Sequence, residues 1–377
     1  MEGKAGTIHS DVYQAYSDNL RKAVGGVFNA DDYGDKYFDL QAQLQSNVSR
    51  FAAYKAYHLT QQLNKKREEW TNDDDFKKVA KAMMNTFNRY QAAEYNTATA
   101  RARTAKQWTD FNSDPIANEL YPNLRWLPSR SANPREEHQA FYWLVLPKTD
   151  NFWKQNQPGN LWNCKCDWEE TDAPIYTKEL TAEELAKARE EDGGIHANGL
   201  EGNPAVTGEI FTQECTYFKQ AGKNRKQRKQ ADIEIADKIR PLLEAELKEK
   251  LLNKESVCNI NGEEHKVMFI SQGISEAAQS MKGTYSYWVK NEILPMISEY
   301  IQKGEFVRRV ESDATHNTRK STLRLKRNTD WFYYFKTKLP DGSDAYINIG
   351  HYKATHQDPS RADRYYFYTI TKQLPSY

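Results

Sequence analysis

The 377-residue sequence has no long apolar run, and its first residues do not combine a charged start with an apolar stretch. A membrane-spanning helix needs roughly 20 mostly apolar residues, and a secretory signal needs the charged and apolar regions together. We therefore expect no membrane span, no signal peptide and no membrane partner. The protein is expected to be made in a cytoplasm and to stay there.

Cysteine is scarce, with four residues in the whole chain. Disulfide-held domains contain many more for their size, and Cys164 and Cys166 lie too close in sequence to link distant segments. We expect reduced thiols.

An excess of one charge is also missing, because 53 basic residues balance 52 acidic ones to a net charge of +1. The whole chain therefore has no field that would attract nucleic acid or a membrane, and only local patches can do so.

Aromatic side chains are plentiful. The hydrophobic fraction is only 38%, but 23 Tyr, 15 Phe and 9 Trp provide large packing surfaces. Folded domains joined by polar segments therefore fit better than a disordered chain. Because the chain exceeds the usual size of one hydrophobic core, we expect two or more domains.

The first third of the chain has the spacing of helices. Apolar residues recur every three or four positions from Leu44 to Leu63 and again from Phe76 to Tyr90. This spacing predicts two long amphipathic helices, separated at the acidic residues 72–75. A further helix follows up to Asp114. Residues 1–118 are therefore predicted to be a helical region.

The rest of the chain has a mixed pattern. Residues 119–220 combine short apolar runs with Pro, Trp and Asn, and residues 181–184 form a capping box, so we predict a small α+β unit. Residues 221–252 are predicted to be a connector, with a basic run at 223–229 followed by a helix that Pro241 kinks or restarts.

Residues 253–377 show alternation at 266–270, a helical stretch at 287–301 and terminal strands at 331–337, 345–349 and 365–371. This pattern predicts a separate C-terminal α+β domain with an antiparallel sheet. The predicted fold class is therefore multidomain α+β.

The middle of the chain carries a recognisable set of motifs. They are Tyr-Asn-Thr-Ala at 95–98, Asn-Pro-Arg-Glu-Glu-His at 133–138, Phe-Trp at 152–153 and a closing segment at 157–166 that ends in Trp-Asn-Cys-Lys-Cys. Over roughly residues 40–220 the chain resembles the phage Mu F-like minor head (head morphogenesis) proteins. Those proteins show an Arg-x-x-His step, a Phe-Trp and a closing Pro-x-x-Trp-Asn-Cys-Arg-Cys.

Three positions depart from that family. Ser131 stands where an acidic residue is common, residues 140–143 replace Ala-Leu-Asp-Gly, and Lys165 replaces an arginine. The resemblance implies a minor component of a tailed-phage head, found in the virion and the host cytoplasm, with a role in capsid assembly or DNA delivery. The portal and capsid proteins are the implied partners.

His138, Cys164 and Cys166 allow two interpretations. An imidazole and two thiolates are suitable zinc ligands, with Asp167 as the nearest fourth. Alternatively, His138 hydrogen-bonds to the backbone while the cysteines pack as small buried side chains and no cofactor is present. We favour the second interpretation.

The last 75 residues are basic and aromatic. Between residues 303 and 377, fourteen basic and eight acidic residues give a net charge of +6. Such a composition is typical of surfaces that contact an RNA or DNA backbone, although a solvated surface can share it.

This segment also contains the residue types needed for RNA cleavage without a metal. That reaction requires a base, an acid and cations around the phosphate. A helix, a His-rich turn and terminal strands in this order resemble the phage-associated nucleases of the barnase, EndoU, colicin and RelE-like group. The candidate catalytic residues are His316, Arg319, His351, Arg361 and Thr369.

Three functions remain open for the C-terminal domain. The first is a metal-independent endoribonuclease with toxin-like action, for which an immunity protein would be a further partner. The second is binding of packaged DNA without cleavage. An ADP-ribosyltransferase is the third class, but no convincing Arg, Ser-Thr-Ser and Glu-x-Glu set is present.

Overall fold

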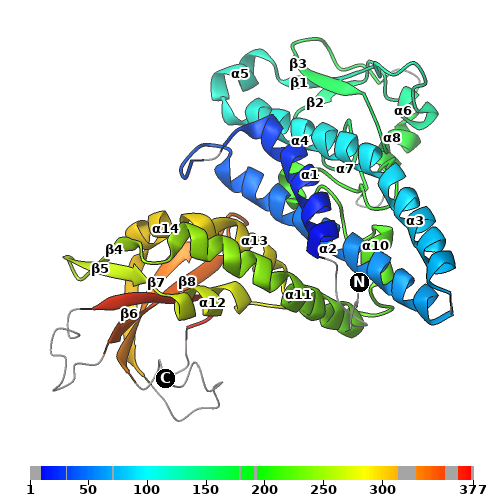
Figure 1. Ribbon diagram of the computed structural model, residues 1–377. Coiled ribbons are helices and arrows are strands. Elements are labelled where there is room, and N and C mark those ends of the chain that lie inside the picture. The colour runs from blue at the N-terminus through cyan, green and yellow to red at the C-terminus, as the bar shows by residue number, and fades with distance from the viewer. Residues whose placement is uncertain are drawn as a thin grey trace. The chain divides into compact units, whose positions relative to one another are not determined.

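The computed structural model contains two compact units, residues 1–228 and residues 229–377, which are considered separately below (Figure 1). It describes residues 10–30, 32–69, 72–177, 180–190, 193–312, 328–352 and 364–374. The mixed α and β composition confirms the predicted fold class.

The first unit begins with long helices: α1 (Ser10–Phe28), α2 (Phe38–Glu69), α3 (Asp73–Arg89), α4 (Gln91–Ser113) and the short α5 (Pro115–Leu120). Helix α1 packs against both α2 and α4. Ala98, Ala102 and Ala105 of α4 are fully buried at spacings of four and three, so small side chains let the neighbouring backbone approach closely. This arrangement agrees with the predicted helical first third.

A buried ion pair stabilises these helices. The Nζ atom of Lys55 lies 2.5 Å from Oε2 of Glu94, and both side chains are almost completely buried. Lys55 also donates to the carbonyl oxygen of Phe87 and lies over the ring of Tyr16. Because a buried charge is costly without partners, these contacts fix how α2 meets α1 and α4.

A small antiparallel sheet follows in the order β2-β1-β3, made of β1 (Asn123–Leu127), β2 (Val145–Pro147) and β3 (Asp167–Thr171). Trp126, Trp153 and Trp168 are fully buried in the core beside it. Short helices connect and flank these strands: α6 (Glu136–Gln139), α7 (Phe152–Gln155), α8 (Ala182–Ala188), α9 (Pro204–Thr207) and α10 (Thr216–Gln220).

The helix of the connector begins earlier than expected, within the basic run. Helix α11 (Arg225–Leu251) runs without interruption through Pro241, and most of the basic run at 223–229 lies in its first turns. The side chains of Lys223, Arg225, Lys226 and Lys229 are exposed, which is typical of a solvated charged surface.

The second unit contains a six-stranded sheet in the order β4-β5-β9-β8-β7-β6. Its strands are β4 (Glu255–Ile260), β5 (Glu263–Phe269), β6 (Glu305–Glu311), β7 (Thr329–Lys338), β8 (Asp344–Tyr352) and β9 (Tyr365–Thr371). Every neighbouring pair is antiparallel except β5 with β9. Three helices and one 3-10 turn lie between β5 and β6: α12 (Ser271–Gln279), α13 (Tyr285–Ile293), η1 (Leu294–Met296) and α14 (Ile297–Lys303).

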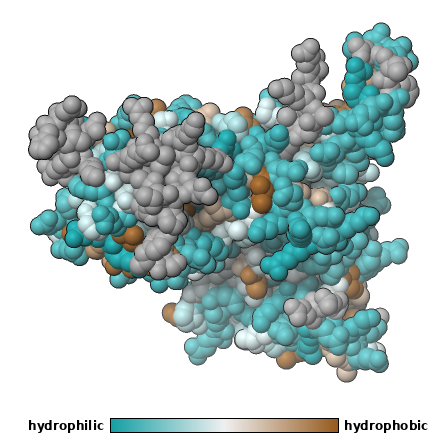
Figure 2. All heavy atoms as spheres, turned by 90° about the horizontal axis from the view of Figure 1, so that it is seen from below, coloured by the Kyte–Doolittle hydropathy of each residue, from teal (hydrophilic) through white to brown (hydrophobic). Residues whose placement is uncertain are grey.

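Within the described residues, no helix combines the length and apolar character required to cross a bilayer. On the face shown in Figure 2, hydrophobic residues form small separate groups among hydrophilic ones.

Candidate metal centre

The candidate metal centre forms where two loops meet beside β1. His138 lies in the one-turn helix α6, and Cys164 and Cys166 lie in the segment that leads into β3. Asn163 adopts a left-handed backbone conformation with φ of 58°, and its N–H donates to Oγ1 of Thr97 at 3.0 Å. Asparagine tolerates this conformation well, so it can reverse the chain just before Cys164.

The segment before the cysteines is fixed by α4. The guanidinium of Arg101 is buried and donates to Oδ1 of Asn160. Gly159 has φ of 104°, and a Cβ atom there would lie 3.1 Å from Cγ of Arg101. Glycine is therefore required both by the backbone conformation and by the close approach.

The three candidate ligand atoms lie close together. Nδ1 of His138 is 3.4 Å from Sγ of Cys164 and 3.8 Å from Sγ of Cys166. All three atoms fall within 4.8 Å of one another, and both thiols are free. His138 is 0% exposed and Cys164 is 6% exposed. The structure therefore brings together the His138, Cys164 and Cys166 set that the sequence singled out.

The two thiols affect each other's protonation. Hydrogen bonding with Cys166 lowers the pKa of Cys164, burial opposes this shift, and hydrogen bonding with His138 adds to the lowering. Hydrogen bonding to Cys164, together with burial, raises the pKa of Cys166. One negative charge on this pair is therefore favoured over two.

Asp167, the expected fourth ligand, is not part of this group. Its Oδ1 accepts from Gln107 at 3.1 Å and its Oδ2 accepts from Arg130 at 2.7 Å. Among the residues that the structure describes, His138, Cys164 and Cys166 are the one His, Cys, Asp or Glu group compact enough to hold a metal ion.

A pocket of about 280 Å³ lies beside Cys164 and Cys166. Most of its lining residues belong to the motifs noted in the sequence, but the pocket itself was not predicted, because the two segments that form it meet only in the folded chain. The lining consists of Cys164 and Cys166 together with Ser129, Ser131, Asn133, Arg135 and Asn163.

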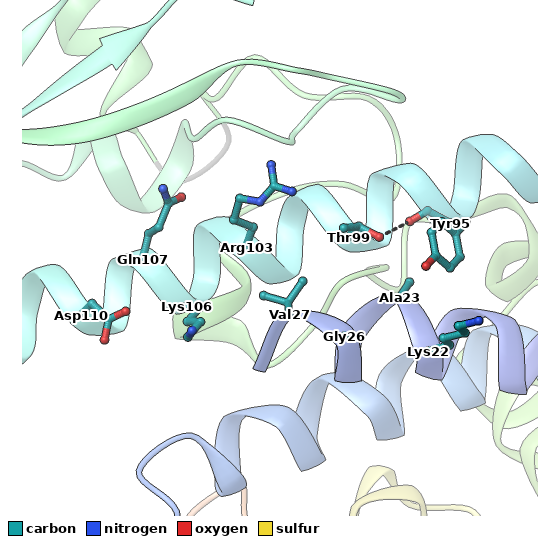
Figure 3. Close-up of a pocket in the computed structure, with 10 residues that line it drawn as sticks. All are labelled: Lys22, Ala23, Gly26, Val27, Tyr95, Thr99, Arg103, Lys106, Gln107 and Asp110. Atoms are coloured by element: carbon teal, nitrogen blue, oxygen red, sulfur yellow. Dashed lines mark hydrogen bonds between the residues drawn. The ribbon is translucent and has the colours of Figure 1, made fainter. Parts of the chain in front are cut away.

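A second pocket, of about 430 Å³, lies between α1 and α4 (Figure 3). Lys22, Arg103 and Lys106 line it with Asp110, whose carboxylate already pairs with Lys36 at 3.0 Å. The excess of positive charge favours anions over cations there.

Two of the five predicted catalytic residues lie in the described part of the second unit. Nδ1 of His351, on β8, is 2.7 Å from Oδ1 of Asp330 on β7. The His351 ring also contacts the ring of Tyr365, with centroids 4.7 Å apart. The sequence prediction missed Asp330, because this cross-strand contact joins residues 21 positions apart.

Thr369 is not brought next to His351. In the β8–β9 register, Thr369 faces Asn348 whereas His351 faces Tyr365. Thr369 is also buried, and its separation from Tyr365 along β9 corresponds to about 13 Å at the usual strand rise. His316, Arg319 and Arg361 lie outside the described residues.

Comparison with known proteins gives one relevant similarity. Over 132 residues the chain is 28% identical to the putative capsid assembly protein F of Escherichia phage Mu. The similar segment makes up 34% of this chain and 27% of the phage protein, so it spans about a quarter of that relative. No protein-family model and no solved structure matches the chain.

Proposed function

We propose that this chain is a component of a tailed-phage head that acts in capsid assembly or DNA delivery. The similarity to the phage Mu protein, whose name describes capsid assembly, carries this proposal. Two of the motifs that resemble the head proteins meet in one core, where His138 and Trp153 both pack against the buried ring of Trp126. The portal and capsid proteins are the proposed partners, and the virion is the proposed location.

Virion composition tests the head proposal. Mass spectrometry of purified particles should detect this chain at low copy number, and deletion of its gene should reduce the yield of filled heads. The expressed chain should also copurify with the portal protein. Particles that lack the chain and assemble at normal yield in the deletion strain would exclude this role.

We propose a metal-independent ribonuclease activity as a second function of residues 229–377. The Asp330–His351 contact carries it, because a carboxylate on Nδ1 holds the imidazole in one tautomer and leaves Nε2 as the nitrogen that takes up a proton. His351 would then accept the proton of the attacking 2′-hydroxyl. His316, Arg319 and Arg361 are proposed as the acid and the phosphate-binding cations, and an immunity protein as the inhibitor.

The ribonuclease proposal is tested by incubating the full chain with RNA in excess chelator. Cleavage should persist, and His351→Ala should slow it by roughly 10²- to 10⁴-fold. Asp330→Asn should also slow it, whereas His265→Ala, which alters another histidine beside Tyr365, should have little effect.

Salt-dependent binding of RNA or DNA without cleavage would instead favour the non-enzymatic nucleic-acid-binding function. Cleavage unchanged in His351→Ala would exclude the proposed base.

A further inference from the structure

We propose that His138, Cys164 and Cys166 bind a zinc ion whose fourth coordination position opens into the adjacent pocket. Water or a small anion would occupy that position. This proposal stands independently of the role in the phage head. It reverses the interpretation favoured from the sequence, because the sequence could not show that all three side chains meet.

The distances fit a metal site without rearrangement of the loops. A tetrahedral zinc with Zn–S bonds of about 2.3 Å and a Zn–N bond of about 2.0 Å places nitrogen and sulfur about 3.5 Å apart. The observed separations from Nδ1 of His138 are 3.4 Å and 3.8 Å. Both edges are thus already close to those of the coordination polyhedron.

The charges also fit. Two thiolates and one neutral imidazole balance the charge of Zn²⁺, so the loaded centre carries no net charge when water occupies the fourth position. Such balance matters because His138 and Cys164 are buried, and an unbalanced charge there would be costly. Binding would displace the remaining protons of Cys164 and Cys166.

The imidazole is held in place by aromatic rings. The ring of His138 lies edge-on to Trp126, with centroids 5.1 Å apart, and packs near Phe141. Nδ1 therefore stays directed toward the two sulfurs, as a ligand atom must be.

The fourth position is the distinctive part of the site. Asp167 is held by Gln107 and Arg130, and the compact group contains no fourth His, Cys, Asp or Glu among the described residues. Cys164 and Cys166 both line the pocket, together with Ser131 and Arg135. Three protein ligands with an open position distinguish catalytic-type zinc sites from closed structural ones.

The second nitrogen of the His138 ring lacks the hydrogen bond that usually supports a metal-binding histidine. Nε2 of His138 is buried and has no hydrogen-bond acceptor in the described part of the chain. Metal-binding histidines usually donate this second N–H, and loss of such a partner weakens metal binding by roughly 10- to 100-fold. We therefore expect a zinc ion that strong chelators can remove.

Metal analysis of the purified full-length chain tests the proposal. We expect near-stoichiometric zinc in the native chain and in Cys258→Ala, which alters a buried free thiol elsewhere. The double variant Cys164→Ser with Cys166→Ser should lose the metal, and His138→Gln should bind it more weakly. Circular dichroism checks that each variant is folded.

Cobalt substitution gives a readout that needs no variant. Co²⁺ added to the chelator-treated native chain should produce sulfur-to-cobalt charge-transfer bands and the visible bands of tetrahedral coordination, and zinc should displace them. Azide should shift the visible bands if the fourth position is open.

Two results would overturn the proposal. A folded native chain that contains no zinc and gives no cobalt bands would remove the metal site. Cobalt bands that azide leaves unchanged would show that the fourth position is closed.

Discussion

At the scale of single residues, Arg101 links α4 to the loop between α8 and α9. Its guanidinium is completely buried and donates to the carbonyl oxygens of Leu200, Glu201 and Gly202. Burial lowers the pKa of Arg101 to about 10, so it remains charged at neutral pH. A fixed positive charge therefore holds these three backbone groups together, and of the three only Gly202 accepts from another described side chain, that of Gln157.

Replacement of Arg101 should be strongly destabilising. We expect Arg101→Met to lower the unfolding free energy of the first unit by about 3 kcal/mol or more, because several buried carbonyl groups lose their donors. Urea denaturation measures this change. Arg103→Met, on an exposed position of the same helix, should change stability by less than about 0.5 kcal/mol. Equal effects of the two substitutions would contradict the assigned role.

His58 should make stability depend on pH. Burial lowers the pKa of His58 below its ordinary value of 6.5, and Nε2 of the ring lies 2.6 Å from Nε2 of Gln62. Between the lowered pKa and 6.5 the unfolded chain binds more protons than the folded one. The contribution of His58 to stability is therefore fully present above pH 6.5 and is lost as the pH falls through the folded-state pKa.

Unfolding free energies measured from neutral to mildly acidic pH test this expectation. His58→Gln should show a smaller loss of stability on acidification than the native chain, because the titrating group is absent. Identical pH profiles for the two proteins would count against it.

At the scale of elements, helix α8 begins with a capping box. Oγ1 of Thr181 accepts from the N–H of Glu184 at 3.2 Å, and Glu184 accepts from the N–H of Thr181 at 2.8 Å. The sequence predicted this box, and the structure confirms it. Leu185 and Ala188 on the same helix reach the tryptophan core, so the cap positions core side chains.

Removal of the cap should have a moderate cost. We expect Thr181→Ala to lower the unfolding free energy by about 1 kcal/mol, since one N–H of the first turn loses its acceptor. Thr181→Ser keeps the hydroxyl and should retain most of the stability. Chemical denaturation of the two variants makes the comparison, and an equal loss in both would argue against the cap.

Elements with strong local signals could be predicted from the sequence. The strand at 365–371 and the helix break at Asn72 agree with the structure, because a run of aromatic and β-branched residues and a capping asparagine are local features. The predicted helix at 287–301 is divided by the 3-10 turn that contains Pro295, whose ring cannot continue the hydrogen-bond ladder.

The composition of each site depends on contacts between residues far apart in the sequence, which local residue spacing does not reveal. The residue types made His138 and the two cysteines a candidate group, but the sequence could not show that they meet, nor that Asp167 binds Gln107 and Arg130 instead. Asp330 was missed for the same reason, since it meets His351 only where β7 pairs with β8, at an irregular point of the register next to the Trp331–His351 pair.

At the scale of the whole molecule, the contacts divide between residues 1–228 and residues 229–377. Each unit has its own sheet and its own buried residues. We therefore expect two unfolding transitions in calorimetry, of which Arg101→Met lowers only one. A single transition that this substitution shifts as a whole would show that the units unfold together.

The order of strands in the second unit has a consequence for protein synthesis. Strand β9 is made after the other five strands, yet it lies inside the sheet between β5 and β8. Until the ribosome has added Tyr365 and the residues after it, the β4–β5 hairpin and the β6–β7–β8 meander each expose an unpaired strand edge. Such edges invite pairing with other chains. Nascent chains translated from one messenger RNA would therefore be prone to aggregate through these edges until β9 is synthesised. A stop codon before Tyr365 would leave the edges unpaired permanently.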